Sequence, residues 1–156
     1  VNTIDEETCV VLGLGNPVYK KKVIQLLTNP NLFFESIIHP SVLLGEAVKI
    51  GKGVVICAGC IITCNIEIKD FATINLACTL GHDTVLNEFV SIMPGSNISG
   101  EVIIEKGVYV GTGARIINQV VIGENTTIGS GAVVSKSIPK NCTAVGIPAK
   151  PIKFHY

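Results

Sequence analysis

From Leu44 onward, an aliphatic residue occupies every sixth position of the chain. Counting in sixes as far as Val134 gives sixteen positions, and each of them is Leu, Ile or Val. The position two residues earlier is nearly always small or β-branched, as at Val54, Cys60 and Ala72. Neither the 3.6-residue period of a helix nor the alternation of an ordinary strand produces a strict period of six. The central part of the chain is therefore expected to be a repeat structure.

The period predicts a mainly β fold, a parallel β-helix of hexapeptide repeats over residues 42–138. Each hexad forms a short strand and a bend, and three hexads make one triangular coil with the aliphatic side chain inside. The second inward position must be small because the interior is narrow. Glycine often follows the aliphatic residue, as at Gly81, and suits bends where a Cβ would be strained. Stacking at the strand spacing gives a prism about 25 Å tall.

Residues eighteen apart should stack in columns along this prism. Cys60 and Cys78 occupy the small inward position one coil apart, so we expect them to pack in the core. The cysteines at 57, 60 and 64 form a C-x2-C-x3-C cluster, but no histidine close in sequence completes a zinc set. We therefore expect free thiols in a reducing cytoplasm and no metal.

The two ends of the chain break the repeat. Before it, we expect a buried strand at residues 8–15, a helix at 16–29 and a second strand at 32–38. Asn16 suits the N-cap and Pro17 the first turn. The apolar face of the helix is expected to contain Val18, Ile24, Leu26 and Leu27.

Three segments follow from this division. Residues 1–41 resemble the last strand–helix–strand unit of a small α/β nucleotide-binding domain whose first part is absent. Residues 42–138 form the β-helix. Residues 139–156 are rich in proline and lose the register, so a loop with a final strand-like arm is expected there.

Charge and hydropathy exclude several classes of partner. Twelve basic and twelve acidic residues give a formal net charge of zero, which favours neither nucleic acid nor an acidic membrane surface. No apolar run reaches the roughly 18 residues of a membrane span, and no signal peptide is visible. We expect a cytoplasmic protein with no membrane insertion.

His82 and Asp83 are the polar residues of the repeat that suggest chemistry. His82 follows a bend glycine and is not at an inward position, so it should face outward. Asp83 could hold the imidazole in one tautomer and stabilise its cation. A solvated surface histidine beside an ordinary bend residue is the alternative. The column through His82 also contains Cys64, Gly100, Asn118 and Lys136.

Two stretches of the chain carry a resemblance to a known family. Residues 74–116, INLACTLGHDTVLNEFVSIMPGSNISGEVIIEKGVYVGTGARI, resemble the sialic-acid O-acetyltransferases and bacillosamine-type sugar N-acetyltransferases, which are left-handed β-helix enzymes. Residues 131–153, GAVVSKSIPKNCTAVGIPAKPIK, are similar to the CoA-binding segment of hexapeptide acyltransferases in general. The combination of G-H-D with PGSNISG is the more specific of the two signals.

The resemblance implies an acetyl-CoA-dependent acetyltransferase that acts on an amino-sugar or sialic-acid-type acceptor, by N-acetylation of a nucleotide-linked sugar or by O-acetylation. It implies a homotrimer with acetyl-CoA between neighbouring prisms. His82 matches the general base, Asp83 its partner acid, and Gly100 a glycine whose N–H meets the acetyl carbonyl. The other positions that match CoA-binding residues are Thr112, Ser130, Lys136, Gly146, Pro148 and Lys150; ordinary solvated surface is the alternative for both lysines.

Two features depart from the family pattern. Ser91 stands where some sugar N-acetyltransferases have a second active-site histidine, so we expect it to contact the substrate. The Gly-rich loop that holds the nucleotide-sugar is reduced to LGLGN. Gly13, Gly15 and Asn16 at the start of a helix could bind a phosphate, although a simple packing turn is the alternative.

Other functions remain open at this stage. Cys64, stacked next to His82, could act as a nucleophile and form an acyl-enzyme. A structural β-helix subunit or a degenerate transferase is a non-catalytic alternative. A zinc carbonic anhydrase of this fold would need three ligand histidines, but His39 and His155 lie outside the repeat.

Overall fold

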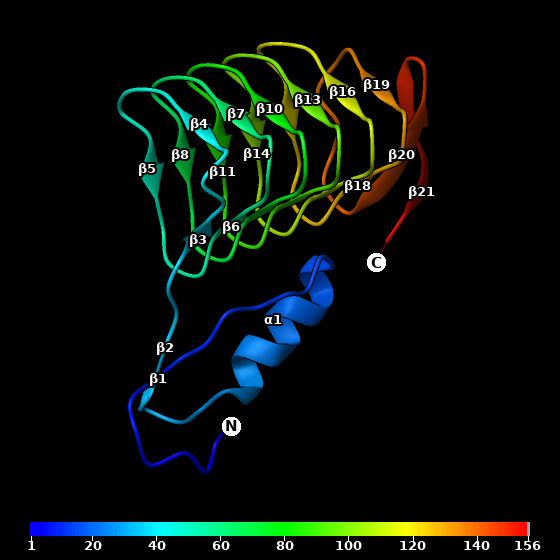
Figure 1. Ribbon diagram of the computed structural model, residues 1–156. Coiled ribbons are helices and arrows are strands. Elements are labelled where there is room, and N and C mark those ends of the chain that lie inside the picture. Colours follow the sequence, from blue (N-terminus) through cyan, green and yellow to red (C-terminus); the bar gives the residue numbers. More distant parts are fainter. Residues whose placement is uncertain (156) are drawn as a thin grey trace.

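The computed structural model describes residues 1–155. Most of the chain is a parallel β-solenoid in which two-residue strands build three flat sheets around a triangular core (Figure 1). Strands pair in parallel with those eighteen residues away, as Leu80 does with Ile62 and Ile98. The predicted left-handed β-helix of hexapeptide repeats is confirmed.

The three sheets are distinguished by their strand numbers. The eight-stranded sheet contains β3 (Ile37–Ile38), β6 (Val55–Ile56), β9 (Thr73–Ile74), β12 (Ser91–Ile92), β15 (Tyr109–Val110), β18 (Thr127–Ile128), β20 (Cys142–Gly146) and β21 (Ala149–Phe154). The six-stranded sheet contains β4 (Leu43–Leu44), β7 (Ile61–Ile62), β10 (Thr79–Leu80), β13 (Asn97–Ile98), β16 (Arg115–Ile116) and β19 (Val133–Val134). The five-stranded sheet contains β5 (Lys49–Ile50), β8 (Glu67–Ile68), β11 (Val85–Leu86), β14 (Ile103–Ile104) and β17 (Val121–Ile122).

The core consists of the two inward positions of each hexad. From Ile56 to Val134, the aliphatic residues at every sixth position are at most 2% exposed. Burying one such side chain contributes about 1.5–3 kcal/mol. Cys60 and Cys78 are both fully buried, as predicted. Leu44 is 45% exposed because the first coil has no neighbour on one side.

The bends repeat the same backbone conformation from coil to coil. Asp83 and Glu101 both have positive φ, at 57° and 58°, although neither is glycine. Their N–H groups donate to the carbonyls of Cys64 and His82 in the preceding coil, at 3.1 and 2.8 Å. These hydrogen bonds hold successive bends in register and so fix the columns in which side chains stack.

The N-terminal unit is a strand, a helix and a strand. β1 (Thr8–Cys9) and β2 (Leu32–Phe33) pair in parallel, and α1 (Pro17–Leu26) connects them. The predictions for the strands were too long. Only the first two residues of the expected strand at 8–15 are paired, and the expected strand at 32–38 is divided into β2 and β3, of which β3 belongs to the solenoid.

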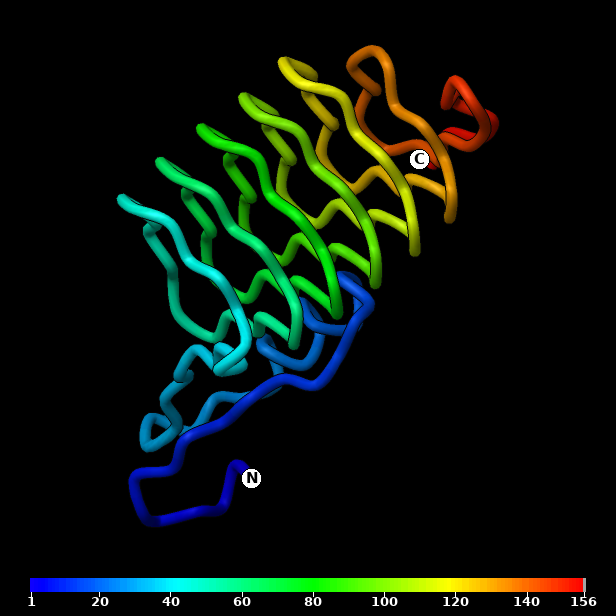
Figure 2. The backbone as a smooth tube through the Cα atoms, turned by 45° about the horizontal axis from the view of Figure 1, so that its top comes forward, coloured from blue at the N-terminus to red at the C-terminus, as the bar shows by residue number. Residues whose placement is uncertain are grey.

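α1 lies alongside the coils (Figure 2). Asn16 caps it as predicted, since its side-chain oxygen accepts from the N–H groups of Val18 and Tyr19. The predicted apolar face is right only in part: Val18 and Leu26 are largely exposed, Ile24 and Leu27 are half-buried, and the two buried residues of the helix are Pro17 and Lys20. No helix in residues 1–155 is long and apolar enough to cross a membrane.

The C-terminal segment is more regular than the predicted loop. β20 continues the solenoid by pairing in parallel with β18, and β21 returns antiparallel to it as the expected arm. The hairpin turn contains a cis peptide bond between Ile147 and Pro148. This hairpin ends the prism on the side opposite to its open first coil.

Candidate active site

His82 lies on the outer corner where the six-stranded sheet passes into the five-stranded sheet. It follows β10 and Gly81 and precedes β11, so the period of six places it in a bend. Its side chain is 55% exposed, which confirms the predicted outward orientation. No core packing restrains the imidazole, and its position therefore depends on polar contacts and on the shape of the wall beneath it.

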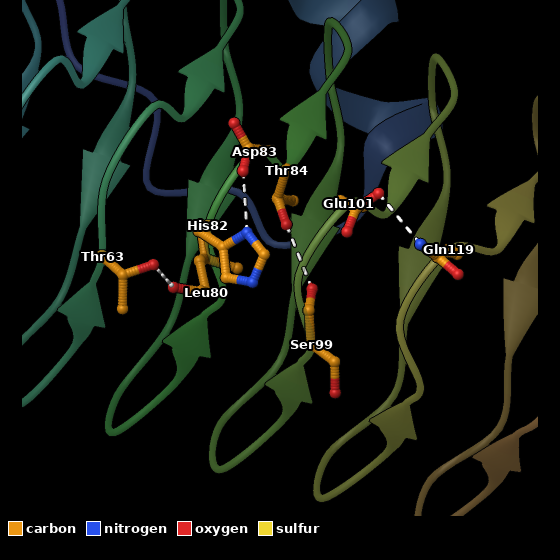
Figure 3. A network of polar contacts seen from close by, with 8 residues as sticks. All are labelled: Thr63, Leu80, His82, Asp83, Thr84, Ser99, Glu101 and Gln119. Carbon is orange, nitrogen blue, oxygen red and sulfur yellow. Dashed lines mark hydrogen bonds and ion pairs between the residues drawn. The ribbon is translucent and has the colours of Figure 1, made fainter.

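Asp83 supplies the polar contact. The Nδ1 atom of His82 is 2.7 Å from Oδ2 of Asp83 (Figure 3). A carboxylate is an acceptor only, so Nδ1 carries the proton and donates, and Nε2 keeps its lone pair. An exposed pair of this kind contributes little to stability. Its effect is to select the tautomer in which Nε2 can accept a proton.

Gly100 supplies the shape of the wall, one coil beyond His82. A Cβ at Gly100 would lie 2.6 Å from Nε2 of His82 and 2.7 Å from Cε1. The imidazole therefore lies directly on the bare backbone of Gly100. A Cβ at Gly81 would in turn lie 2.4 Å from the Gly100 nitrogen. Both glycines are thus needed for the close approach of the two coils under the ring.

Gly100 is buried beneath the imidazole, but its N–H is not engaged by the protein. Among the hydrogen bonds formed by residues 1–155, none uses this group as a donor. A backbone N–H beside the histidine is suited to stabilise an oxyanion. His82, Asp83 and Gly100 thus combine an oriented, exposed imidazole with an unpaired backbone donor in the buried wall beneath it.

Neighbouring polar residues support this corner without contacting the imidazole through an observed hydrogen bond. Glu101, the acidic residue one coil beyond Asp83, accepts from Gln119 at 3.0 Å (Figure 3). Thr84 is fully buried and donates to the Ser99 carbonyl at 3.1 Å. Thr84 is not among the candidate residues that the motifs indicate. The sequence does contain a signal for Thr84: it places a hydroxyl at the second inward position of its hexad, which in most hexads is aliphatic, alanine or cysteine.

The residues that match CoA-binding positions lie at different places: Gly100 and Lys136 stack in the column of His82, and the others lie away from it. Thr112 and Ser130 are exposed on consecutive coils, at the corner between the eight-stranded and six-stranded sheets. Within one chain, the whole six-stranded sheet separates this corner from His82. The remaining residues of this group are also exposed: Lys136, Gly146, Pro148 and Lys150.

Ser91 does not lie where a substrate could reach it. It is fully buried on β12, and its hydroxyl has no hydrogen-bond partner among residues 1–155. This placement runs against the expectation of a substrate contact. The cause is tertiary: in this sheet, α1 packs over the outer face of the coils, which a pattern within the repeat does not reveal.

Gly13, Gly15 and Asn16 precede α1 on the side of the eight-stranded sheet. A Cβ at Gly15 would lie 3.5 Å from the Met93 side chain, so this loop packs against the coils. The Asn16 oxygen is engaged in capping the helix. Beside it lies a hollow of about 230 Å³ whose lining includes Asn16 and Tyr109. These observations favour a packing turn with an adjoining cavity.

The cysteines do not converge on a common site. All six are free, and the described part of the chain contains no group of three or more His, Cys, Asp or Glu side chains suited to a metal ion. Cys57 is partly buried, Cys60 is fully buried and Cys64 is exposed, so the C-x2-C-x3-C cluster is spread between the core and the surface.

Comparisons with known proteins give this geometry a context. Residues 101–136 match the family of bacterial transferase hexapeptides (six repeats). A comparison with curated protein sequences gave no match. WeeI from Acinetobacter baumannii AYE superposes with a TM-score of 0.90 at 31% identity, covering 96% of this chain and 72% of WeeI.

Two further similar structures are of an acetyltransferase domain and of a protein with bound ligands. The acetyltransferase domain of PglB from Neisseria gonorrhoeae has a TM-score of 0.86 and 31% identity, covering 91% of this chain and 69% of that domain. PerB from Caulobacter crescentus, in complex with CoA and GDP-perosamine, has a TM-score of 0.90 and 30% identity, covering 94% and 70%. At this identity over nearly all of its length, the chain belongs to the hexapeptide-repeat sugar acetyltransferases, the left-handed β-helix acyltransferase family that its motifs predicted.

Proposed function

We propose that this protein transfers the acetyl group of acetyl-CoA to the amino group of a nucleotide-linked amino sugar, with His82 as the general base. The observation that carries the proposal is the orientation of one imidazole. Asp83 holds Nδ1, Gly100 lies under the ring, and Nε2 is left free at an exposed corner. PerB with CoA and GDP-perosamine, and the PglB domain with acetyl coenzyme A, provide the substrate classes.

The reaction is a direct transfer. The neutral sugar amine attacks the thioester carbonyl, and Nε2 of His82 takes the proton that the nitrogen loses as the C–N bond forms. The negative charge on the carbonyl oxygen is stabilised by the Gly100 N–H. The C–S bond then breaks, and the imidazolium returns its proton to the CoA thiolate. General-base assistance of this kind contributes about 10²–10⁴-fold.

The positions of Thr112 and Ser130 favour an active site made from two copies of the chain, whereas Lys136 lies in the column of His82 itself. Thr112 and Ser130 lie on a different corner from His82, so one copy does not present them to its own imidazole. We propose a homotrimer in which acetyl-CoA lies along the Thr112 corner of one copy and reaches His82 of the next. Sedimentation equilibrium tests this state, and a monomer at assay concentration would contradict it.

The test of the proposed function is acetyl transfer by wild type and His82→Ala, measured as CoA thiol release with GDP-perosamine and other nucleotide-linked amino sugars. We expect His82→Ala to lose at least about 10²-fold in kcat/KM and to keep its sedimentation behaviour. Asn118→Ala, an exposed change in the same column, is the control. Near-normal activity of His82→Ala contradicts the base assignment, and a product with an alkali-labile ester contradicts N-acetylation.

The Cys64 acyl-enzyme is the competing mechanism. Cys64 is an exposed free thiol one coil before His82, and its carbonyl accepts from the Asp83 N–H. Direct transfer predicts that Cys64→Ala retains activity and that no acetylated Cys64 is trapped. Detection of that thioester by mass spectrometry during turnover would replace the direct mechanism.

A further inference from the structure

Lys20 is the one charged residue buried in the described chain. It projects from α1, and its side chain is 1% exposed. Its Nζ atom is 2.8 Å from the Phe71 carbonyl oxygen, 3.0 Å from Oγ1 of Thr73 and 3.3 Å from the Val90 carbonyl oxygen. Phe71 and Thr73 lie on one coil of the solenoid, and Val90 lies on the next. The Lys20 side chain therefore connects α1 to two consecutive coils.

The wall needs a donor at this point. Phe71 occupies a bend with φ of 57°, and among the described hydrogen bonds its carbonyl accepts from Lys20 alone. Bends left open to solvent can be hydrated, but α1 covers this one and Phe71 itself is 6% exposed. An unpaired buried carbonyl costs about 1–3 kcal/mol. Lys20 therefore replaces the water that the helix excludes.

The bonding capacity of the amino group fits this position. An ammonium has three N–H donors, equal to the number of acceptors observed, and a neutral amine still donates two. No ion pair among residues 1–155 involves Lys20. A lysine that served only to solubilise α1 would extend into water, as Lys22 does on the exposed side of the same helix.

The other residues of α1 are less deeply buried: Lys21, Val23 and Ile24 are half-buried. Apart from Lys20, its one buried residue is Pro17. Lys21 adds a hydrogen bond from Nζ to Oδ1 of Asn125 at 2.8 Å, and its side chain also lies against Gly107. The loop of Gly13, Gly15 and Asn16 runs directly into this helix, so whatever fixes the helix along the coils also fixes the loop.

We propose that Lys20 is a positioning residue: by occupying the notch formed by Phe71, Thr73 and Val90, it sets the placement of α1 and of the loop that precedes it against the solenoid. A second part of the inference rests on the proposed function: the hollow of about 230 Å³ beside this loop receives the acceptor, so Lys20 acts on the affinity for the acceptor and not on the acetyl donor. The structural part of the inference does not depend on the activity.

Hydrogen exchange measured by mass spectrometry on the full chain tests the structural part. In Lys20→Met, we expect amide protection in residues 13–27 to fall by about tenfold or more, while peptides from the six-stranded sheet keep theirs. Lys22→Met is the matched control and should leave both unchanged. Unchanged protection of residues 13–27 in Lys20→Met would overturn the inference.

A double-mutant cycle separates a specific bond from general loss of packing. Thr73→Val removes one acceptor at nearly constant shape, so it should weaken protection of α1 in the wild-type background and have no effect in Lys20→Met. Additive effects would contradict a direct bond. If Lys20→Met fails to fold, Thr73→Val alone still tests the inference, because it should lower the amide protection of residues 13–27.

Kinetics test the role in catalysis. With an acceptor that wild type acetylates, Lys20→Met should raise the acceptor KM by about tenfold or more, with the acetyl-CoA KM unchanged, and Lys22→Met should change neither. If Lys20→Met loses amide protection in α1 but keeps the acceptor KM of wild type, Lys20 positions the helix, and its proposed effect on acceptor affinity is overturned. Inactive wild type would refute the proposed function alone, since hydrogen exchange needs no turnover.

Discussion

The imidazole of His82 rests on the backbone of Gly100, with Nε2 2.6 Å from the place where a Cβ would stand. A methyl group there must displace the ring, since the other close atoms around Gly100 are also those of the imidazole. The position of the proposed base is thus set by the absence of a side chain on the next coil. Because the period of six makes the two residues neighbours, this dependence can be tested by one substitution.

Gly100→Ala should lower kcat/KM by about 10²-fold, the cost of misplacing a catalytic group by roughly 1 Å. Its φ is not in the left-handed region, so the backbone tolerates alanine and the fold should remain. Steady-state kinetics and thermal unfolding measure the two effects. Ser99→Ala, an exposed change at the preceding residue, is the control. Wild-type kcat/KM in Gly100→Ala would show that the ring does not need this surface.

Asp83→Asn tests the tautomer argument. The amide loses the charge that stabilises the imidazolium and can present a donor to Nδ1 in place of an acceptor. We expect kcat/KM to fall about tenfold or more, and by less than in His82→Ala. Stability should be almost unchanged because the pair is exposed.

The matched control for Asp83→Asn is Glu101→Gln. Glu101 occupies the same position one coil further along, but its carboxylate accepts from Gln119 and makes no bond to the His82 imidazole. Each variant removes one negative charge from the same column. Equal losses in the two would indicate a general electrostatic effect of the column and would contradict a specific role of Asp83 in orienting the imidazole.

The solenoid predicts an unequal distribution of stability along its axis. Ile92 is fully buried in the middle of the prism, so Ile92→Ala should lower the free energy of unfolding by about 2–5 kcal/mol. Leu44 has the same place in the repeat but is 45% exposed in the first coil, and Leu44→Ala should cost about 1–2 kcal/mol. Urea unfolding at equal protein concentration measures both, and equal losses would show that the first coil is covered in solution.

The sequence predicted best the features that follow from the repeat. A strict period of six determines which residues point inward and which lie one coil apart, so the burial of Cys60 and the contact of His82 with Gly100 could be foreseen. The placement of α1 could not. Val18 and Leu26 of its predicted apolar face are exposed, and its most deeply buried side chain is that of Lys20, because the wall presents carbonyl oxygens that need donors.

The burial of Lys20 also predicts a dependence of stability on pH. Burial lowers the pKa of the Lys20 amino group from 10.5 to about 7. The charged residues on the elements around it are Lys21 and Lys22 on α1, Lys69 and Asp70 beside Phe71, Glu88 beside Phe89, and Lys106, whose ammonium lies over the Phe89 ring at 5.9 Å. None of them forms an ion pair with Lys20 among the described residues, and desolvation is the cause of the shift.

Because the folded protein binds the Lys20 proton less tightly than the unfolded chain does, stability rises with pH between about 7 and 10.5. The contribution is complete above 10.5 and is lost as the pH falls through 7. Its slope is at most about 1.4 kcal/mol per pH unit. Urea unfolding of wild type and Lys20→Met at pH 6.5 and 9 isolates the effect, since the other titrating groups are common to both. The stability of wild type relative to the variant should increase at pH 9; a constant or decreasing difference would show that Lys20 keeps its proton when buried.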